Sequence, residues 1–187
     1  MQKQLYSDTD LVLQCMKGNQ QAFKMLYERY AGRMLAICLR YVGDSDTAHD
    51  LMQDGFLKAY TSMHRFRPQG EGSLAAWLGT IMRNEALMYL RQNDVLKGSI
   101  SMDNAPEAAE VPDEDEVDRI PSEVLMQLLS ELPVGYRTVL NLYVMEGKSH
   151  KEIAELLGIK ERSSASQLVR AKAVLAEKVN EWLKNNK

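Results

Sequence analysis

Residues 149–172 read SHKEIAELLGIKERSSASQLVRAK, and this stretch predicts two helices joined by a tight turn. Ser149 and Glu152 have the spacing of a capping box, in which each side chain binds a backbone amide that the start of a helix leaves free. Gly158 interrupts the apolar spacing before a second helical stripe begins. The pattern is that of a helix-turn-helix, whose second helix has the dimensions to enter a DNA major groove, although an ordinary helical hairpin has the same spacing.

The second predicted helix carries polar and basic side chains away from its apolar stripe. Leu168, Ala171 and Leu175 form that stripe, so the remaining positions face away from the core. Basic side chains bind phosphates, and Arg or Gln can contact base edges in the major groove. The predicted DNA contacts on this helix are Arg162, Ser163, Ser166, Gln167, Arg170 and Lys172.

The charge of the chain is distributed unevenly along its 187 residues. Residues 1–93 carry 11 Lys and Arg against 9 Asp and Glu, and residues 122–187 carry 10 against 8. Residues 94–121 carry 2 against 9, so this segment, at -7, turns two flanks of +2 each into a net charge of -3. The same segment holds three of the five prolines and shows no sustained helical period, which predicts an acidic, extended linker between two domains.

Both flanking segments show helical periods, and neither shows a convincing strand. The predicted fold class is therefore all-α, with two small helical bundles at 1–93 and 122–187 joined by the linker at 94–121. The predicted helices are Ser7–Gly18, 19–42, 45–64, a helix from Ser73, 122–132, 134–146, 149–157 and 160–185.

Composition excludes several classes of protein. No apolar run approaches the roughly 20 residues that span a bilayer, so we expect no membrane insertion. The first ten residues lack the apolar stretch of a secretory signal, and Cys15 and Cys38 are too few for a disulfide framework or a zinc site. These features favour a cytoplasmic protein with two buried thiols.

The chain carries no recognisable catalytic or cofactor-binding motif, so we expect no enzyme activity, no catalytic residues and no cofactor. Its three histidines are scattered and lack the spacing of metal ligands, so we also expect no metal site. Asp46, Asp50 and Asp54 lie at intervals of four on one helix face. A solvated acidic face, or a docking face for a basic partner, accounts for them better than a metal site does.

The loop at 65–72 combines an aromatic residue with two arginines, a proline and two glycines. Aromatic and Arg side chains near a flexible loop suit the capture of unstacked bases from single-stranded DNA. The alternative is that Phe66 and Trp77 only close the helical bundle. The predicted contacts of the loop and the helix after it are Arg65, Phe66, Arg67, Arg83, Asn84 and Arg91.

Three stretches in order resemble the extracytoplasmic-function group of the sigma-70 family, the promoter-recognition subunits of bacterial RNA polymerase. They are DSDTAHDLMQDGFLKAY, then FRPQGEGSLAAWLGTIMRNEAL, then LPVGYRTVLNLYVMEGKSHKEIAELLGIKERSSASQLVRAK. The resemblance covers nearly the whole chain, with the acidic segment where that group has its connector.

The resemblance implies a role for each part. The helix DLMQDGFLKAY would dock on the largest polymerase subunits, with Leu51 and Phe56 in the core. Its implied polymerase contacts are Asp50, Gln53, Asp54 and Lys58. The loop and the helix from Ser73 would recognise and melt the minus-10 element, and the helix-turn-helix would bind the minus-35 element. The implied partners are core RNA polymerase, promoter DNA and, as for many similar proteins, an anti-sigma factor.

The sequence departs from the usual pattern of that family in four places, so its promoter cannot be copied from relatives. Leu74 replaces a frequent aromatic, Met88 a common Asp, Lys160 the usual Ser or Thr cap, and Ala165 a frequently basic residue. Two alternatives stay open at this point. One is a free-standing DNA-binding regulator, and the other is an adaptor of two helical bundles that binds only proteins.

Overall fold

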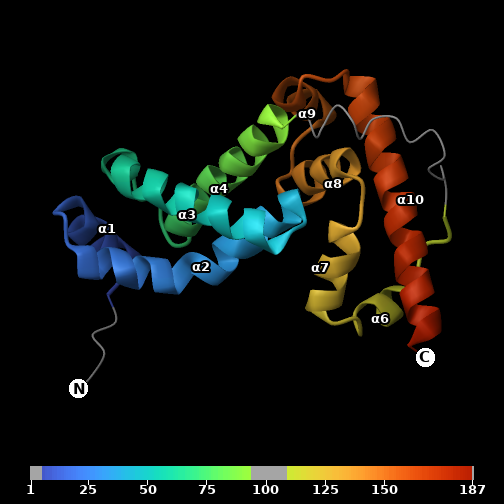
Figure 1. Ribbon diagram of the computed structural model, residues 1–187, viewed down its shortest axis with the longest axis horizontal. Helices are drawn as coiled ribbons and strands as arrows, with labels where there is room; N and C mark the ends of the chain where they lie inside the picture. Colours follow the sequence, from blue (N-terminus) through green and yellow to red (C-terminus); the bar gives the residue numbers. More distant parts are fainter. Residues whose placement is uncertain (1–5, 94–108, 187) are drawn as a thin grey trace. The chain divides into compact units, whose positions relative to one another are not determined.

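The computed structural model describes residues 6–93 and 109–186, and every regular element within these ranges is a helix (Figure 1). The prediction of an all-α fold is confirmed. No helix in the described ranges is long and apolar enough to cross a membrane. The chain forms two compact units, which comprise residues 1–39 with 44–88 and residues 40–43 with 89–187.

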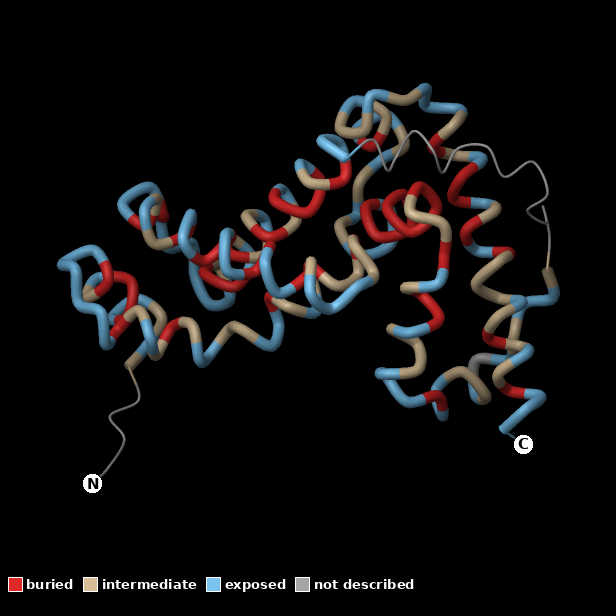
Figure 2. Tube along the Cα trace, in the orientation of Figure 1, coloured by how far each residue is buried: buried red, intermediate tan, exposed pale blue. Residues whose placement is uncertain are grey.

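The first unit is built from amphipathic helices whose apolar faces form one core. Its elements are α1 (Asp8–Met16), most of α2 (Gln20–Val42), α3 (Ser45–Ser62), the short helix η1 (Met63–Arg65) and most of α4 (Ser73–Gln92). Aromatic rings join α2 to α3, because Phe23 lies edge-on to Phe56 and Tyr60 with ring centroids 6.5 and 4.8 Å apart. Figure 2 shows buried and exposed residues alternating along these helices, as amphipathic packing requires.

The start of α1 is fixed by a capping box at Ser7, where the sequence predicts that the helix begins. The Asp10 amide donates to Ser7 Oγ at 3.1 Å, and the Ser7 amide donates to the Asp10 carboxylate at 3.2 Å. These bonds use amides that have no partner inside the helix, so they define the first turn of α1.

The second unit is organised around α10, which packs against α7, α8 and α9. Its elements are α6 (Glu114–Val117), α7 (Ser122–Ser130), α8 (Val134–Leu140), the π-helical turn η2 (Asn141–Met145), α9 (His150–Leu157) and α10 (Glu161–Asn185). The helix predicted at 134–146 is therefore α-helical only as far as Leu140. In η2 the backbone amide of Glu146 donates to the carbonyl of Asn141, five residues earlier.

The end of the acidic segment is folded against the second unit. Ile120 is 5% exposed and packs in an apolar cluster with side chains of α7 and α10. The Asn180 side chain donates to the Glu110 carbonyl at 2.8 Å. The structure thus differs from the prediction of one extended segment over 94–121, because apolar residues interspersed among the acidic ones anchor its end. Residues 94–108 lie outside the described residues.

Candidate nucleic-acid interface

The predicted helix-turn-helix forms as α9 and α10, and both sequence signals for it are confirmed. The Glu152 amide donates to Ser149 Oγ at 3.3 Å, and the Ser149 amide donates to the Glu152 carboxylate at 2.9 Å. The Ser149 amide is the main cause that lowers the pKa of Glu152 from 4.5 to about 2. Gly158 follows α9 with a φ of 68°, a left-handed conformation that a β-carbon disfavours.

A contact that the sequence analysis missed joins the two helices of this motif. His150 Nδ1 of α9 lies 3.0 Å from Ser164 Oγ of α10, and Ser164 is fully buried. The Tyr143 ring stacks on His150 with centroids 4.8 Å apart. The pair therefore helps to set how α10 lies against α9. No periodic pattern signals a bond between residues so far apart along the chain.

The first turns of α10 present a polar stripe to solvent. Arg162, Ser166 and Arg170 follow one another at intervals of four, so they share one side of the helix. Arg162, Ser166 and Lys172 are exposed, while Ser163 and Arg170 are half-buried. Lys160 precedes the helix at the cap position and makes no side-chain capping bond, as the sequence indicates. We call Arg162, Ser163, Ser166 and Arg170 the α10 stripe.

Gln167 was predicted as a DNA contact, but the structure buries it, so it does not belong to the α10 stripe. Its residue is only 7% exposed. It shares the buried face of α10 with Ser164, Leu168 and Ala171, which lie three residues before it and one and four after it. A side chain on that face packs against the rest of the unit, so Gln167 has a structural role.

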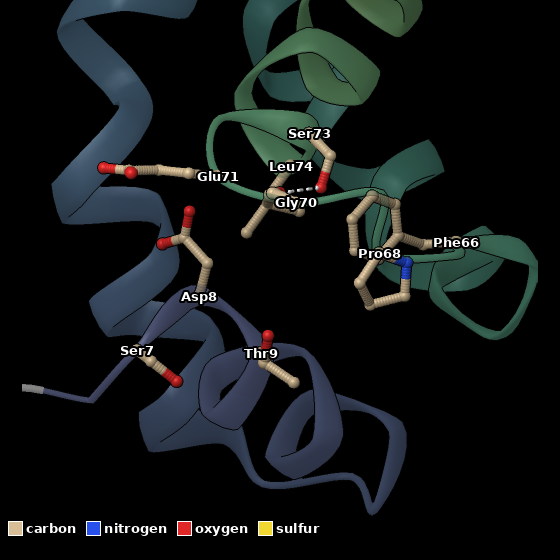
Figure 3. Close-up of a pocket in the computed structure, with 9 residues that line it drawn as sticks. All are labelled: Ser7, Asp8, Thr9, Phe66, Pro68, Gly70, Glu71, Ser73 and Leu74. Atoms are coloured by element: carbon tan, nitrogen blue, oxygen red, sulfur yellow. Dashed lines mark hydrogen bonds between the residues drawn. The ribbon is translucent and has the colours of Figure 1, made fainter.

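In the first unit, a hollow of about 520 Å³ lies between the start of α1 and the loop that leads into α4 (Figure 3). The residues that line it are Ser7, Asp8, Thr9, Phe66, Pro68, Gly70, Glu71, Ser73 and Leu74. The loop was predicted as a site of base capture. No pattern in the sequence indicates that α1 supplies the opposite wall.

Two residues of α2 hold the α1 wall in place. Arg29 Nη1 donates to Asp8 Oδ1 at 2.7 Å, and the Tyr30 hydroxyl donates to Asp8 Oδ2 at 2.5 Å. Arg29 also donates to the Tyr6 carbonyl at 2.7 Å. Burial and the bond to Asp8 raise the pKa of Tyr30 to about 12, so its hydroxyl stays a donor at physiological pH. The Asp8 carboxylate is therefore held at the edge of the hollow.

Phe66 packs in the helical bundle, which is the alternative to base capture that the sequence left open. It is 6% exposed, and its ring lies 5.3 Å from the Trp77 ring at an angle of 50°. It also lines the hollow, so it supports the site as part of its apolar wall (Figure 3). A fully exposed stacking platform is not what the structure shows.

The loop around the hollow is held by its own hydrogen bonds. Ser73 Oγ donates to the Gly70 carbonyl at 2.8 Å and accepts the Gln69 amide at 3.2 Å. Arg67 donates to the carbonyls of His64 and Phe66 at 2.8 and 3.0 Å. These bonds fix the backbone of the loop. Part of the Arg67 guanidinium is thus engaged in the loop, while the neighbouring Arg65 is exposed.

The other predicted contacts on α4 are not among the lining residues of the hollow. Asn84 is exposed and Arg83 is half-buried, both within the first unit. Arg91 is exposed and belongs to the second unit. Within the first unit, the structure therefore brings together the loop and α1, and Arg83 and Asn84 lie outside that hollow.

The predicted docking helix is α3, and its exposed face is both acidic and apolar. Asp50, Gln53 and Asp54 are exposed, while Leu51 and Phe56 are buried as predicted. Leu57 follows Asp54 by three residues and Gln53 by four, and it is 63% exposed. We call Asp50, Gln53, Asp54 and Leu57 the α3 face. Leu57 is an addition to the predicted set, and its one-turn spacing from Gln53 could have indicated it.

Lys58 follows Asp54 by one helical turn, at the margin of the α3 face, and joins α3 to α4. Its Nζ is 2.5 Å from the Glu85 carboxylate, which is only 8% exposed. Lys58 thus compensates a buried charge, and its predicted polymerase contact competes with that role. Asp46, Asp50 and Asp54 are all exposed. Among the described residues, no group of three His, Cys, Asp or Glu could hold a metal ion.

Comparison with known protein families matches two regions of the chain. The chain matches the family models Sigma-70 region 2 over residues 26–95 and Sigma-70, region 4 over residues 122–175. It is 29% identical over 183 residues to the ECF RNA polymerase sigma-E factor of Haemophilus influenzae, which covers 92% of this chain and 95% of that protein. It is 27% identical over 184 residues to the RNA polymerase sigma-H factor of Pseudomonas aeruginosa, covering 90% and 91% of the two chains.

A solved structure, that of CnrH in complex with the cytosolic domain of CnrY, is also similar to this chain. The identity is 25%, the alignment covers 91% of this chain and 96% of CnrH, and the TM-score is 0.46.

Proposed function

We propose how the surfaces of this chain divide the tasks of a sigma factor. The chain belongs to the extracytoplasmic-function group of the sigma-70 family. It therefore directs core RNA polymerase to specific promoters and initiates transcription by melting DNA. The first unit, which carries most of the region 2 match, docks on polymerase and captures the minus-10 element. The second unit, which carries the region 4 match, binds the minus-35 element. The observation that carries this division is the hollow in one unit and the α10 stripe in the other.

The α3 face is the proposed polymerase contact. Three exposed polar side chains lie in the two turns of α3 before Leu57, whose exposure leaves apolar area that a partner can bury. An apolar anchor inside a polar rim is the arrangement that concentrates binding energy in protein interfaces. Asp50 and Asp54 favour a basic partner surface. Lys58 supports this face indirectly, through Glu85.

The hollow beside the loop is the proposed site for one unpaired base of the minus-10 element. Its volume of about 520 Å³ is in the range of ligand pockets, roughly 300–1,000 Å³, and it cannot admit a duplex. Extruding a base costs a few kcal/mol, which contacts in a fitted pocket offset. Arg65 is exposed near the loop and is available to the DNA backbone.

The α10 stripe is the proposed minus-35 contact, together with Lys172. Its arginines lie on the outside of a helix, where they can reach phosphates and base edges in the major groove. The bond between His150 and Ser164 holds this helix at a fixed angle to α9. Gln167 is left out of the set because it is buried.

This task requires no catalytic group or cofactor in the chain, because core polymerase makes the phosphodiester bond. We therefore assign it no enzyme activity of its own. Its proposed location is the cytoplasm, where polymerase and promoter DNA are found. An anti-sigma factor, the further partner that the family implies, would act by covering the α3 face, the hollow or the α10 stripe.

Transcription by purified core polymerase tests the proposed function. Fragmented genomic DNA is transcribed with and without this chain, and the RNA start sites are mapped. New starts that share two upstream elements are the expected result. No new starts, with the chain still binding duplex DNA alone, would show a free-standing regulator instead. Binding to polymerase without any promoter selectivity would show an adaptor.

A further inference from the structure

The end of the acidic segment lies on α10, the helix that carries the α10 stripe. We call residues 110–120 the strap. The Asn180 side chain donates to the Glu110 carbonyl at 2.8 Å, and Ile120 is 5% exposed in the apolar cluster formed with α7 and α10. The strap is therefore held at both of its ends, beside the C-terminal part of α10 (Figure 1).

A turn of helix inside the strap places two apolar side chains in this cluster. The Asp115 amide donates to Asp113 Oδ1 at 2.9 Å, and the Val117 amide donates to the Asp113 carbonyl at 3.0 Å. Asp113 thus caps α6 at its start. Val117 and Ile120, three residues apart, both pack in the cluster that includes Val179 of α10. The strap is a folded part of the second unit.

The strap shortens the chain that joins α4 to the second helical bundle. We call residues 94–109 the tether. A chain spans at most about 3.3–3.6 Å per residue, so the 17 steps from Asn93 to Glu110 reach about 60 Å. If the strap were released, the 29 steps from Asn93 to Ser122, where α7 begins, would reach about 100 Å. Holding the strap therefore removes nearly half of the available reach.

The length of the tether matters because each of its ends is fixed to a reading surface. Ser73 lines the hollow and begins α4, which continues as one helix to Gln92. Asn180 lies on α10, the same helix as the α10 stripe. The minus-35 and minus-10 elements lie more than two turns of duplex apart, which is over about 70 Å. The anchored tether is shorter than this distance, and a released tether would exceed it.

We propose that the strap makes this chain select promoters by the length of the DNA spacer between the two elements. Ile120 and Asn180 are positioning residues, because they act through the length of the tether. Each added base pair separates the elements by about 3.4 Å and rotates them by about 35°, and a short tether leaves little room for either change. The inference rests on the proposed function, since it takes the hollow and the α10 stripe as the two promoter sites.

The test uses holoenzyme made from core polymerase and the full chain. One promoter is made with spacers from three base pairs shorter to three longer than its best length, and the transcript yield is measured for each. Ile120→Ala combined with Asn180→Ala releases the strap. At the best spacer the yield should fall by about twofold, because the effective concentration of a tethered site falls as the −3/2 power of tether length. At the longest spacer it should rise roughly tenfold, because a tether too short to span two sites contributes almost nothing.

Three further measurements separate tether length from stability. Twelve Gly and Ser residues inserted after Asn104 lengthen the tether as much as release does, with the strap intact, and should give the same spacer profile even if the double variant does not fold. Val124→Ala removes apolar area of α7 from the same cluster, and it should lower thermal stability without changing the profile. Hydrogen exchange at the Val117 and Ile120 amides should be slow in the wild type and fast in the double variant.

The outcomes separate this inference from the function on which it rests. A wild-type chain that supports no promoter-specific transcription contradicts the proposed function itself. Normal transcription with the same spacer profile for the wild type, the double variant and the insertion overturns only the inference. A changed profile in only one of these two folded variants, or an equal change in Val124→Ala, overturns it as well.

Discussion

The hollow of the first unit and the α10 stripe of the second unit carry opposite charge, and the proposed function assigns them opposite ways of binding nucleic acid. The stripe places arginines on the outside of a helix, where positive charge neutralises phosphates. The hollow has carboxylates at its edge and apolar side chains within, so it suits a base that has left its stack. The sign of the charge at each site thus indicates which part of DNA it contacts, and the net charge of -3 does not.

The difference also separates two physical tasks. Binding a duplex requires a convex, exposed surface that fits a groove, and its strength depends on salt. Holding one melted base requires an enclosed site whose walls stay fixed, because misplaced acceptors would not distinguish bases. Arg29 and Tyr30 supply that rigidity at the hollow, and the bond between His150 and Ser164 supplies it at α10.

The largest effect is expected from Phe66→Ala, which tests whether the hollow depends on packing. Phe66 is 6% exposed and packs on Trp77, and truncating such a buried aromatic costs about 3–5 kcal/mol. Thermal unfolding should show the loss, and permanganate reactivity of unpaired promoter thymines should fall with it. Pro68→Ala, at an exposed position of the same loop, should stay stable. Lost melting at unchanged stability would show that the ring stacks on DNA instead.

The next largest effect is expected from Arg170→Ala, which removes one cation from the α10 stripe. A good Arg contact in the major groove contributes about 1–3 kcal/mol, so promoter-specific transcription should fall roughly 10- to 100-fold. Binding to core polymerase, measured by fluorescence anisotropy, should be unchanged. Equal losses of promoter use and polymerase binding would contradict the assignment of Arg170 to DNA.

Gln167→Met sharpens the boundary between the α10 stripe and the buried face beside it. Gln167 is 7% exposed, and Met fills a similar volume, so promoter affinity should stay within about twofold of the wild type. Arg162→Ala, on the exposed side, serves as the matched contrast. It should reduce the slope of the logarithm of the binding constant against the logarithm of the salt concentration by about one. A tenfold loss of promoter affinity in Gln167→Met would return Gln167 to the DNA contacts.

The smallest effect is expected from the pH dependence of the α9 capping box. Hydrogen bonds from Ser149 and Lys148 lower the pKa of Glu152 to about 2 in the folded chain. Because the unfolded chain binds this proton more readily, the box stabilises fully above about pH 5 and weakens as the pH falls toward 2. Glu152→Gln can keep the capping geometry and should flatten this part of the pH profile of thermal stability. An unchanged profile would contradict the role of the carboxylate.

Local chemistry made the helices and the turn of the helix-turn-helix predictable. Ser149 and Glu152 are three residues apart, and Gly158 alone supplies the left-handed turn, so the sequence contains all that α9 needs at its ends. The buried face of α10 could also be predicted from the sequence. Gln167 precedes Ala171 by four residues, so the helical period already places both on one side.

The hollow could not be predicted, because its walls come from segments far apart in the sequence. Nothing near Asp8 in the sequence indicates that it lines the same hollow as Glu71, and the packing of α1 against η1 and its bond to α2 bring the two residues to one site. The role of Lys58 has the same origin, since its partner Glu85 lies on another helix. Long-range pairs of this kind leave no periodic signal in a single sequence.

A base-by-base substitution profile of one promoter tests the division of tasks most directly. Every position from the minus-35 to the minus-10 element is changed in turn, and transcription is measured with the wild-type chain, Glu71→Gln and Arg170→Ala. The account predicts that Glu71→Gln alters base preference only within the minus-10 element and that Arg170→Ala alters it only within the minus-35 element. Changes by both variants at the same positions would contradict it.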